Sequence, residues 1–563
     1  LHELEVIGKN NTQENNLLTF APTVSQLKGR NFSQKKQTSL GDSLQNELGV
    51  SSTGFGPNSS RPVIRGLDGD RIKVLQNGLG TIDASSQSAD HAISADTLTM
   101  DQIEIVRGPM TLLYGSSAVG GIVNLVTNRI HSSFHEGFKA QTMTQYESVS
   151  SGLSNSIKVD FGKHNWMFHV DGSLRDLKNV ATPVGEIKNS ANRQDNLALA
   201  TTKIFEKGYL GFSYNHFKTL YGVVAEEKVI IDMKQNRFEL QGEWRPDNIF
   251  FQKIKFKSAQ SSYHHQEVDD GMVGTNFKNK GNETRLEAIN ESEKLKGVIG
   301  LQSQIFDFEA LGDEAFLPKV RSQQISLFAY QEIIRSNNSF RAGARLEDTD
   351  IKTQTDFKSF TSLSGSFGHE YRLNKENSFT TSFSYNERTP SFQELFANGP
   401  HLATATFEFG NHALHKEKSY ALELSYKSDL KRNTFIFNIY AQRFNDYIAL
   451  SPTGAVDTNS GLAISNYNQV DALFYGVELE NKFNLTHAFS IKNTFDLVQA
   501  KDTTHHYNLP RISPPRLGAT FEYSKGKSIV DLGFNYVFKQ TKLALNETET
   551  AAYFLTNMNY SLK

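Results

Sequence analysis

The chain of 563 residues contains no cysteine. Disulfide bonds and thiolate metal sites are therefore excluded, and any metal ion would need histidine, carboxylate or backbone oxygen ligands. No run of 18 apolar residues occurs, so no transmembrane helix is expected. No basic segment followed by an apolar one opens the chain, and we therefore expect a mature form without a signal peptide.

The chain also has no large excess of positive or negative charge, since it contains 59 Lys and Arg residues and 61 Asp and Glu residues. This balance gives no electrostatic case for a nucleic-acid partner. The sequence shows no nucleophile–base set, phosphate-binding loop or zinc-protease helix, so we do not expect an enzyme. Aromatic residues, by contrast, are plentiful, with 40 Phe and 20 Tyr in a chain too long for one ordinary soluble core.

Alternation of apolar and polar residues dominates the chain after about residue 130. A period of two is the period of a strand, and one apolar face with one polar face suits a membrane barrel with a wet lumen. The clearest examples are the segments 157–161, 379–385, 420–427 and 530–538.

The connectors between these strands differ in length in a regular way. Short turns such as 427–433 and 484–487 alternate with long segments such as 388–418 and 451–469. A barrel in an outer membrane has short turns at one end and long loops at the other. A large soluble β-solenoid or propeller is the alternative, but no internal repeat of fixed length is visible.

Three glycine-marked motifs follow one another before residue 130. They are Arg-Pro-Val-Ile-Arg-Gly at 61–66, a strand ending in Asn77-Gly78, and Ile-Glu-Ile-Val-Arg-Gly-Pro at 103–109. Asn-Gly favours a hairpin turn. Together these motifs resemble the plug domain of TonB-dependent outer-membrane receptors, and the signature residues of that resemblance are Arg61, Arg65, Gly66, Arg107 and Gly108.

This resemblance implies a mainly β fold, in which a 22-stranded transmembrane antiparallel β-barrel holds an N-terminal α/β plug in its lumen. We expect a TonB-box segment and linker at 1–19, the plug at 20–130 and the barrel at 131–563. The resemblance also implies a monomer among outer-membrane lipid in a Gram-negative bacterium, with import energised by TonB and its inner-membrane complex. No cofactor is required for such transport.

A short extended apolar segment lies at the start of the chain, formed by Leu4, Glu5, Val6 and Ile7. A partner can capture an exposed strand of this kind by edge pairing. The resemblance places the TonB box here, whereas the segment alone is also compatible with a frayed terminus.

A Ser-rich plug segment at 83–92 contains the pair Asp90-His91. Carboxylate and imidazole are both competent zinc ligands. Judged by its chemistry alone, the pair is more often a capped loop turn. The surrounding segment, however, resembles the plug loop of the zinc-uptake (ZnuD-type) branch, which implies Zn²⁺ as the transported ligand.

Barrel loops offer further ligands for the three or four positions that zinc needs. We predict a site of Asp90, His91, Glu314 and His401, drawn from the plug and two outer loops. A weaker secondary relay is predicted at His264, His265 and Glu267, which we place in a third outer loop at 263–270, and at His412 and His415 near His401.

Two features depart from the pattern of the zinc-uptake branch, and the first counts against zinc as the cargo. The segment 223–228 carries no histidine, although a His-rich loop often follows this strand in the zinc branch. The chain ends at 559–563 without the usual closing aromatic strand, so we expect about 20 of the 22 strands and a truncated sequence.

Two other cargoes fit the same fold. The elements around 387–395, His401 and Asn411 roughly match the layout of a haem receptor, in which an axial ligand stands in a broad apolar pocket. The acidic residues beside the histidines favour a metal cation instead. A ferric siderophore receptor also remains open, as does a binding protein without transport.

Overall fold

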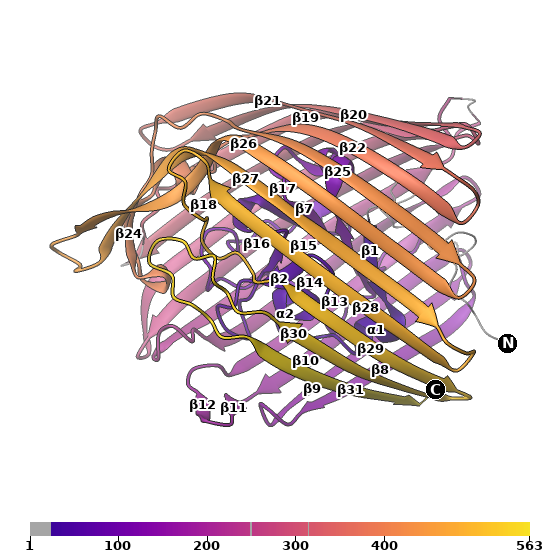
Figure 1. Ribbon diagram of the computed structural model, residues 1–563, viewed down its shortest axis with the longest axis horizontal. Coiled ribbons are helices and arrows are strands. Elements are labelled where there is room, and N and C mark those ends of the chain that lie inside the picture. The colour runs from indigo at the N-terminus through magenta and orange to yellow at the C-terminus, as the bar shows by residue number, and fades with distance from the viewer. Residues whose placement is uncertain (1–23, 248–249, 313–314, 563) are drawn as a thin grey trace.

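The computed structural model describes residues 24–247, 250–312 and 315–562, and it shows a plug enclosed by a large barrel (Figure 1). The predicted TonB box at residues 4–7 and the predicted ligand Glu314 lie outside the described residues. No helix in the described part is long and apolar enough to cross a membrane.

The plug is built on a five-stranded sheet in the order β1-β6-β7-β4-β5. The pair β4–β7 is parallel, while β1–β6, β6–β7 and β4–β5 are antiparallel. Asn77 (φ 53°) and Gly78 (φ 87°) form the turn between β4 and β5, as the Asn-Gly pair predicted. The plug elements are β1 (Val24–Lys28), α1 (Gly29–Ser33), α2 (Leu40–Leu44), β2 (Val50–Ser52), β3 (Pro62–Ile64), η1 (Gly69–Arg71), β4 (Ile72–Gln76), β5 (Leu79–Gly80), β6 (Gln102–Val106), η2 (Gly108–Tyr114) and β7 (Gly121–Val126).

In the described residues, twenty long strands form the wall, and each pairs antiparallel with the next wall strand along the chain. The ring closes with β31 beside β8. The strands are β8 (Gly137–Glu147), β9 (Gly152–Lys163), β10 (Trp166–Leu177), β13 (Asn192–Phe205), β14 (Gly208–Gly222), β15 (Val229–Trp244), β16 (Lys253–Asp269), β17 (Met272–Glu291), β18 (Leu295–Gly312), β19 (Val320–Arg335), β20 (Asn338–Lys352), β21 (Phe357–Arg372), β22 (Asn377–Arg388), β25 (Glu417–Leu430), β26 (Asn433–Val456), β27 (Ala463–Asn484), β28 (Phe489–Asp502), β29 (Arg516–Lys525), β30 (Ser528–Val537) and β31 (Tyr553–Leu562).

Smaller elements decorate the loops. β11 (Val180–Thr182) and β12 (Gly185–Ile187) form a hairpin outside the ring. The predicted long loop at 388–418 holds α3 (Phe392–Phe396), β23 (Asn398–His401), η3 (Leu402–Thr404) and β24 (Thr406–Phe409). β23 and β24 bring the ring order to 22 strands, and β24 pairs in parallel with β27.

The barrel wall is polar inside and apolar outside. On β15, Arg237 and Glu239 are 2% and 3% exposed, whereas Phe238 and Leu240, which alternate with them, are 43% and 38% exposed. In a water-soluble fold the apolar side chains would be the buried ones. Lipid around the wall and a polar plug within it explain this inverted arrangement.

Two segments expected as loops are strands in the structure. β16 continues through 263–269. Tyr263, His265 and Glu267 are buried on its inner face, and His264 and Gln266 lie on its outer face. β26 and β27 likewise extend far into the segment 451–469. In both cases the period of two persists beyond the point where we placed the strand end.

Candidate metal centre

A plug segment that follows β5, residues 81–101, carries Asp90 and His91 to the barrel wall. Asp83 ties this segment together with both of its carboxylate oxygens. One oxygen accepts from the backbone N–H (3.1 Å) and hydroxyl (2.7 Å) of Ser85. The other accepts from the N–H (3.1 Å) and hydroxyl (2.9 Å) of Ser94. The two ends of the loop between these serines are therefore held together by Asp83, within the plug itself.

Tyr221, near the end of β14, holds the tip of this loop. Its hydroxyl donates to the carbonyl oxygen of Asp90 and accepts from the N–H of Ala92, both at 2.9 Å. The two bonds flank His91, so they fix its backbone from both sides. From within the plug, the Arg61 guanidinium donates to the carbonyl oxygen of Ser88, at 3.4 Å.

His91, His265 and Glu267 converge at the wall. The Nε2 atom of His91 lies 3.3 Å from Oε1 of Glu267, and Nε2 of His265 lies 3.8 Å from the same oxygen. The two imidazole rings are 4.4 Å apart. One ligand atom from each residue lies within 4.8 Å of the others, and all three residues are buried. Two imidazoles and one carboxylate form a zinc-ligand set that leaves a coordination position open.

The hydrogen bonds behind these ligands orient them. Nδ1 of His91 lies 3.0 Å from the carbonyl oxygen of Ala84, to which Nδ1–H can donate, and this leaves Nε2 to face Glu267. Nδ1 of His265 lies 2.6 Å from the hydroxyl of Tyr263. Outer-shell partners of this kind set the tautomer and ring direction of metal-binding histidines.

Two buried atoms of the cluster have no hydrogen-bond partner among the described residues, namely Nε2 of His265 and Oε2 of Glu267. A buried polar atom without a partner is costly, and a bound cation is one explanation for it. Phe277 closes the apolar side, with its ring 4.9 Å from His91 and 4.5 Å from His265. A β-bulge between β16 and β17 directly follows Glu267.

Burial lowers the pKa of His91, but the carboxylates of Asp90 and Glu267 outweigh this effect and raise that pKa to about 9. Without a metal ion, a proton on His91 therefore compensates the negative charge of the cluster. A divalent cation would take over that role by displacing the proton.

Asp90 and His401 meet through Ser88 rather than directly. The Ser88 hydroxyl contacts both Oδ1 of Asp90 and Nε2 of His401, the latter at 2.6 Å. Nδ1 of His401 lies 2.7 Å from Oε1 of Glu408, and the Phe316 ring stacks on the imidazole at 4.6 Å. The β23–β24 hairpin thus contacts the plug loop three residues from His91.

The other predicted ligands lie apart from this cluster. His264 faces away from the lumen on β16, opposite to its neighbour His265. His412 is exposed and lies 3.5 Å from Asp356, and His415 is exposed. The structure thus brings together one residue predicted for the main site and two predicted for the relay. Tyr221, Tyr263 and Phe277 are site residues that we did not predict from the sequence, although the period of two places Tyr263 on the same face of the strand as His265.

Ion pairs connect the plug signature to the barrel. Arg65 bonds to Glu423 (3.0 Å) and Glu478 (2.8 Å), and Arg107 approaches Glu478 at 3.3 Å. Arg71 likewise donates to Glu417 at 2.6 Å. These plug arginines thus anchor the plug to the barrel strands β25 and β27.

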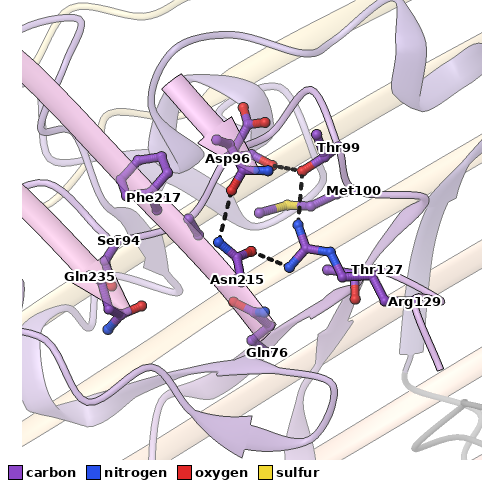
Figure 2. A pocket seen from close by; sticks show the side chains of 12 residues that line it. Gln76, Ser94, Asp96, Thr99, Met100, Thr127, Arg129, Asn215, Phe217 and Gln235 are labelled. Carbon is purple, nitrogen blue, oxygen red and sulfur yellow. Dashed lines mark hydrogen bonds between the residues drawn. The ribbon is translucent and has the colours of Figure 1, made fainter. Parts of the chain in front are cut away.

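Two hollows follow the boundary between plug and wall. A cavity of about 240 Å³, open to solvent, is lined by Arg61, Lys73, Asp83 and Arg388 among others. A smaller polar pocket is shown in Figure 2, where Arg129 donates to Asn215 and Thr99. Ser94 and Asp96, from the loop that carries His91, also line this second pocket.

Two family models match the chain. The model described as "TonB dependent receptor-like, beta-barrel" covers residues 165–563, and the "TonB-dependent Receptor Plug Domain" covers residues 17–122. Among curated relatives, an iron-regulated outer membrane virulence protein of Vibrio cholerae is 29% identical over 141 residues, 24% of this chain and 20% of that protein. The vitamin B12 transporter BtuB of Vibrio cholerae is 34% identical over 93 residues, 16% of this chain and 13% of that protein. The matched segment thus spans about a fifth or less of these relatives.

Solved structures share the whole fold at low identity. The copper transporter OprC has a TM-score of 0.86 at 16% identity, over 96% of this chain and 90% of that chain. The FrpB iron transporter from Neisseria meningitidis has a TM-score of 0.76 at 13% identity, over 96% and 92%. The siderophore receptor PirA from Acinetobacter baumannii has a TM-score of 0.75 at 14% identity, over 96% and 92%.

These matches establish the class of protein. The barrel places the protein in the outer membrane of a Gram-negative bacterium, and the family comprises transporters rather than enzymes. The family model of the barrel covers most of the sequence, and the model of the plug covers the part before it. The chain belongs to the TonB-dependent receptor family.

Proposed function

We propose that the protein imports a divalent transition-metal ion across the outer membrane, with Zn²⁺ as its cargo and TonB as its energy source. The observation that carries this proposal is the convergence of His91, His265 and Glu267, two of whose buried atoms find no partner in the described part of the chain. His91 belongs to the plug and the other two ligands belong to the wall. A pull on the plug would therefore separate the ligands and release the ion.

The ligand chemistry favours zinc over harder or softer ions. Imidazole with carboxylate suits Zn²⁺, whereas Mg²⁺ and Ca²⁺ prefer sites made of oxygen alone. Thiolate is excluded because the chain has no cysteine. The open coordination position suits a cargo that must enter and leave.

Copper is the second candidate, because Met233 pairs directly with His265 across β15 and β16. Met233 is fully buried and belongs to the same apolar cluster as Tyr221, Tyr263 and Phe277. A thioether is a soft ligand that selects Cu(I). Replacing Met233 by Leu separates the two cargoes, since zinc affinity is expected to stay within about twofold while a thioether-bound Cu(I) would be lost.

Haem and ferric siderophores are less favoured. His401, the loop histidine of the haem layout, has both ring nitrogens engaged and Phe316 stacked on its ring. A haem iron would need one of those nitrogens. The cavity of about 240 Å³ between plug and wall, with Arg61 and Arg388 in its lining, is the feature that would favour a siderophore, and none of the three cluster residues lines it.

Zinc titration of the purified, metal-free protein tests the proposal. In the H91A/H265A variant we expect zinc affinity at this site to fall at least about 100-fold, since two of three ligands are gone. H264A is the matched control, because His264 lies next to His265 but faces the other side of the strand. Its zinc affinity should equal that of the wild type.

A crystal grown with zinc gives the structural readout. We expect an anomalous peak at the zinc edge between His91 and Glu267, and no such peak for the H91A/H265A variant. Unchanged zinc binding in that variant, or a Soret shift with haem in a protein without zinc affinity, would overturn the assignment.

A further inference from the structure

A second cluster of potential metal ligands lies where the chain passes from the plug to the barrel. His131 belongs to the tether between β7 and β8, while Asp160 lies on β9 and His169 on β10. Asp160 and His169 face each other directly across the β9–β10 pair. Nε2 of His131 and Nδ1 of His169 approach the same oxygen of Asp160, at 2.8 Å and 2.6 Å. These three ligand atoms lie within 4.8 Å of one another.

An outer shell orients His169 for coordination. Its Nε2 lies 2.9 Å from Oδ2 of Asp171, and Arg129 holds that carboxylate with bonds of 2.6 Å and 3.1 Å. Because Arg129 keeps Asp171 charged and in place, Nε2–H of His169 donates to it. Nδ1–H then donates to Asp160, and loss of that proton to a metal ion would give the carboxylate–histidine–metal arrangement of known zinc sites.

The 2.6 Å contact between Nδ1 of His169 and Oδ1 of Asp160 is a hydrogen bond, and a metal ion bound here would displace its proton. An imidazole lone pair and a carboxylate oxygen at 2.6 Å repel each other unless a proton or a metal ion joins them. The side chains of His131 and Asp160 are 17% and 24% exposed, so an ion and its water ligands can reach them, while His169 is 4% exposed. The ring of His135 lies 5.9 Å from that of His131 and offers a further imidazole nearby.

The second cluster lies at the opposite end of the barrel from the first. Asp160 and His169 flank the short turn at 164–165, and β10 pairs from that turn onward with the end of β13. β14 then begins at Gly208 beside the same end and runs to Tyr221, which holds the loop of His91. Short turns at 164–165 and 206–207 mark this end of the barrel, which is the side from which TonB would pull in the proposed import.

We propose that His131, Asp160 and His169 form a second site for a divalent transition-metal ion, on the release side of the barrel. The existence of the site is independent of the proposed import. Its role, to bind the imported ion before release from the barrel, rests on that proposed function. The pocket in Figure 2 is consistent with this role, because residues from both the His91 loop and the Arg129 tether line it. An ion bound here also joins the tether to the wall, since His131 is its one tether ligand in the triad.

Metal counting on the full chain tests the proposal. Metal-free protein in detergent is loaded with Zn²⁺, and bound zinc is measured after desalting. We expect two equivalents for the wild type and one for H131A/D160A. H164A is the matched control, because His164 lies in the adjoining turn outside the cluster, and it should bind two. Co²⁺ in place of Zn²⁺ gives an absorption spectrum that reports the nitrogen and oxygen ligands.

The outcomes separate this proposal from the first. If H91A/H265A retains two equivalents while H131A/D160A loses one, the proposed cargo site fails and the second site stands. If H131A/D160A binds as much zinc as the wild type, the cluster is a hydrogen-bonded latch only and the inference is wrong. The milder H131Q variant guards against misfolding, and it should keep the heat-dependent gel mobility of a folded barrel while losing the second ion.

Discussion

Tyr221 shows how one side chain outside the ligand set can control the cargo site. Its hydroxyl bonds to the backbone on both sides of His91 and provides no metal ligand itself. Because His91 is the plug's contribution to the triad, its placement depends on this clamp. Removing the hydroxyl should therefore affect affinity without removing any ligand.

We predict that Tyr221→Phe lowers zinc affinity by about 10-fold, the lower end of what outer-shell changes cost. The ring remains to fill the apolar cluster, so the barrel should fold as before. Calorimetric titration measures the effect. Tyr214→Phe, whose hydroxyl on the same strand bonds to Asn236 instead, is the control, and an equal loss in both variants would contradict the clamp.

Residue chemistry made part of the cargo site predictable. Asp90-His91 is visible in the sequence because it lies in a plug segment with a recognisable pattern. The contact between His91 and His265 could not be predicted. The two residues are far apart in the chain and meet only because the plug packs inside the barrel. A strand that continues past its expected end then turns His265 inward and His264 outward.

At the scale of elements, the plug is attached to the wall through arginine–glutamate contacts. Glu478 on β27 receives both Arg65 (2.8 Å) and Arg107 (3.3 Å), and its side chain is 1% exposed. Removing one partner of a buried ion pair leaves the other charge uncompensated, which costs about 3–5 kcal/mol. Here two guanidinium groups would lose the same carboxylate.

We predict that Glu478→Gln loosens the plug while the barrel stays intact. Hydrogen exchange should speed up in β3 and β6, which adjoin Arg65 and Arg107, whereas exchange in the wall strands stays slow. Glu480→Gln is the matched control, because Glu480 lies on the same strand in a more exposed pair with Lys492. Equal exchange in the two variants would argue against a seating role for Glu478.

The elements themselves were largely predictable and their ends were not. Alternation located β9, β22, β25 and β30, because lipid on one side and a polar lumen on the other impose a period of two. Where a strand ends depends on its neighbour in the barrel, as β16 shows by pairing with β15 as far as Asp269. The β23–β24 hairpin inside a long loop had no comparable signal.

For the whole molecule, bound metal should couple the two domains. The proposed cargo ligands come from plug and wall, so an ion bound between them stabilises their contact. Ligand binding to the folded state alone adds about 4.1 kcal/mol at a concentration 1,000 times Kd.

We therefore predict that zinc raises the unfolding temperature of the wild-type protein, with a smaller rise in H91A/H265A. A detergent-solubilised sample followed by intrinsic fluorescence gives the measurement, and H264A should behave as the wild type. If zinc raised the unfolding temperature equally in all three proteins, its stabilising effect would lie outside the cargo site.

The absence of cysteine allows a direct test of plug movement in the whole molecule. Ser51 on β2 and Ser513 in the loop between β28 and β29 have their hydroxyl oxygens 2.8 Å apart. Two thiols at these positions lie within reach of a disulfide, whose bond length is about 2.05 Å. No native thiol competes, because the chain has no cysteine.

We predict that oxidised S51C/S513C still binds zinc but no longer imports it, since the plug is fixed to the wall while the cargo ligands are untouched. Zinc uptake by cells under zinc starvation measures import, and titration of the purified protein measures binding. Reduction should restore uptake, and each single cysteine variant should transport normally in both redox states. Full import through the cross-linked protein would mean that the ion passes without movement of β2 from the wall, and the release step would then have to lie in the His91 loop alone.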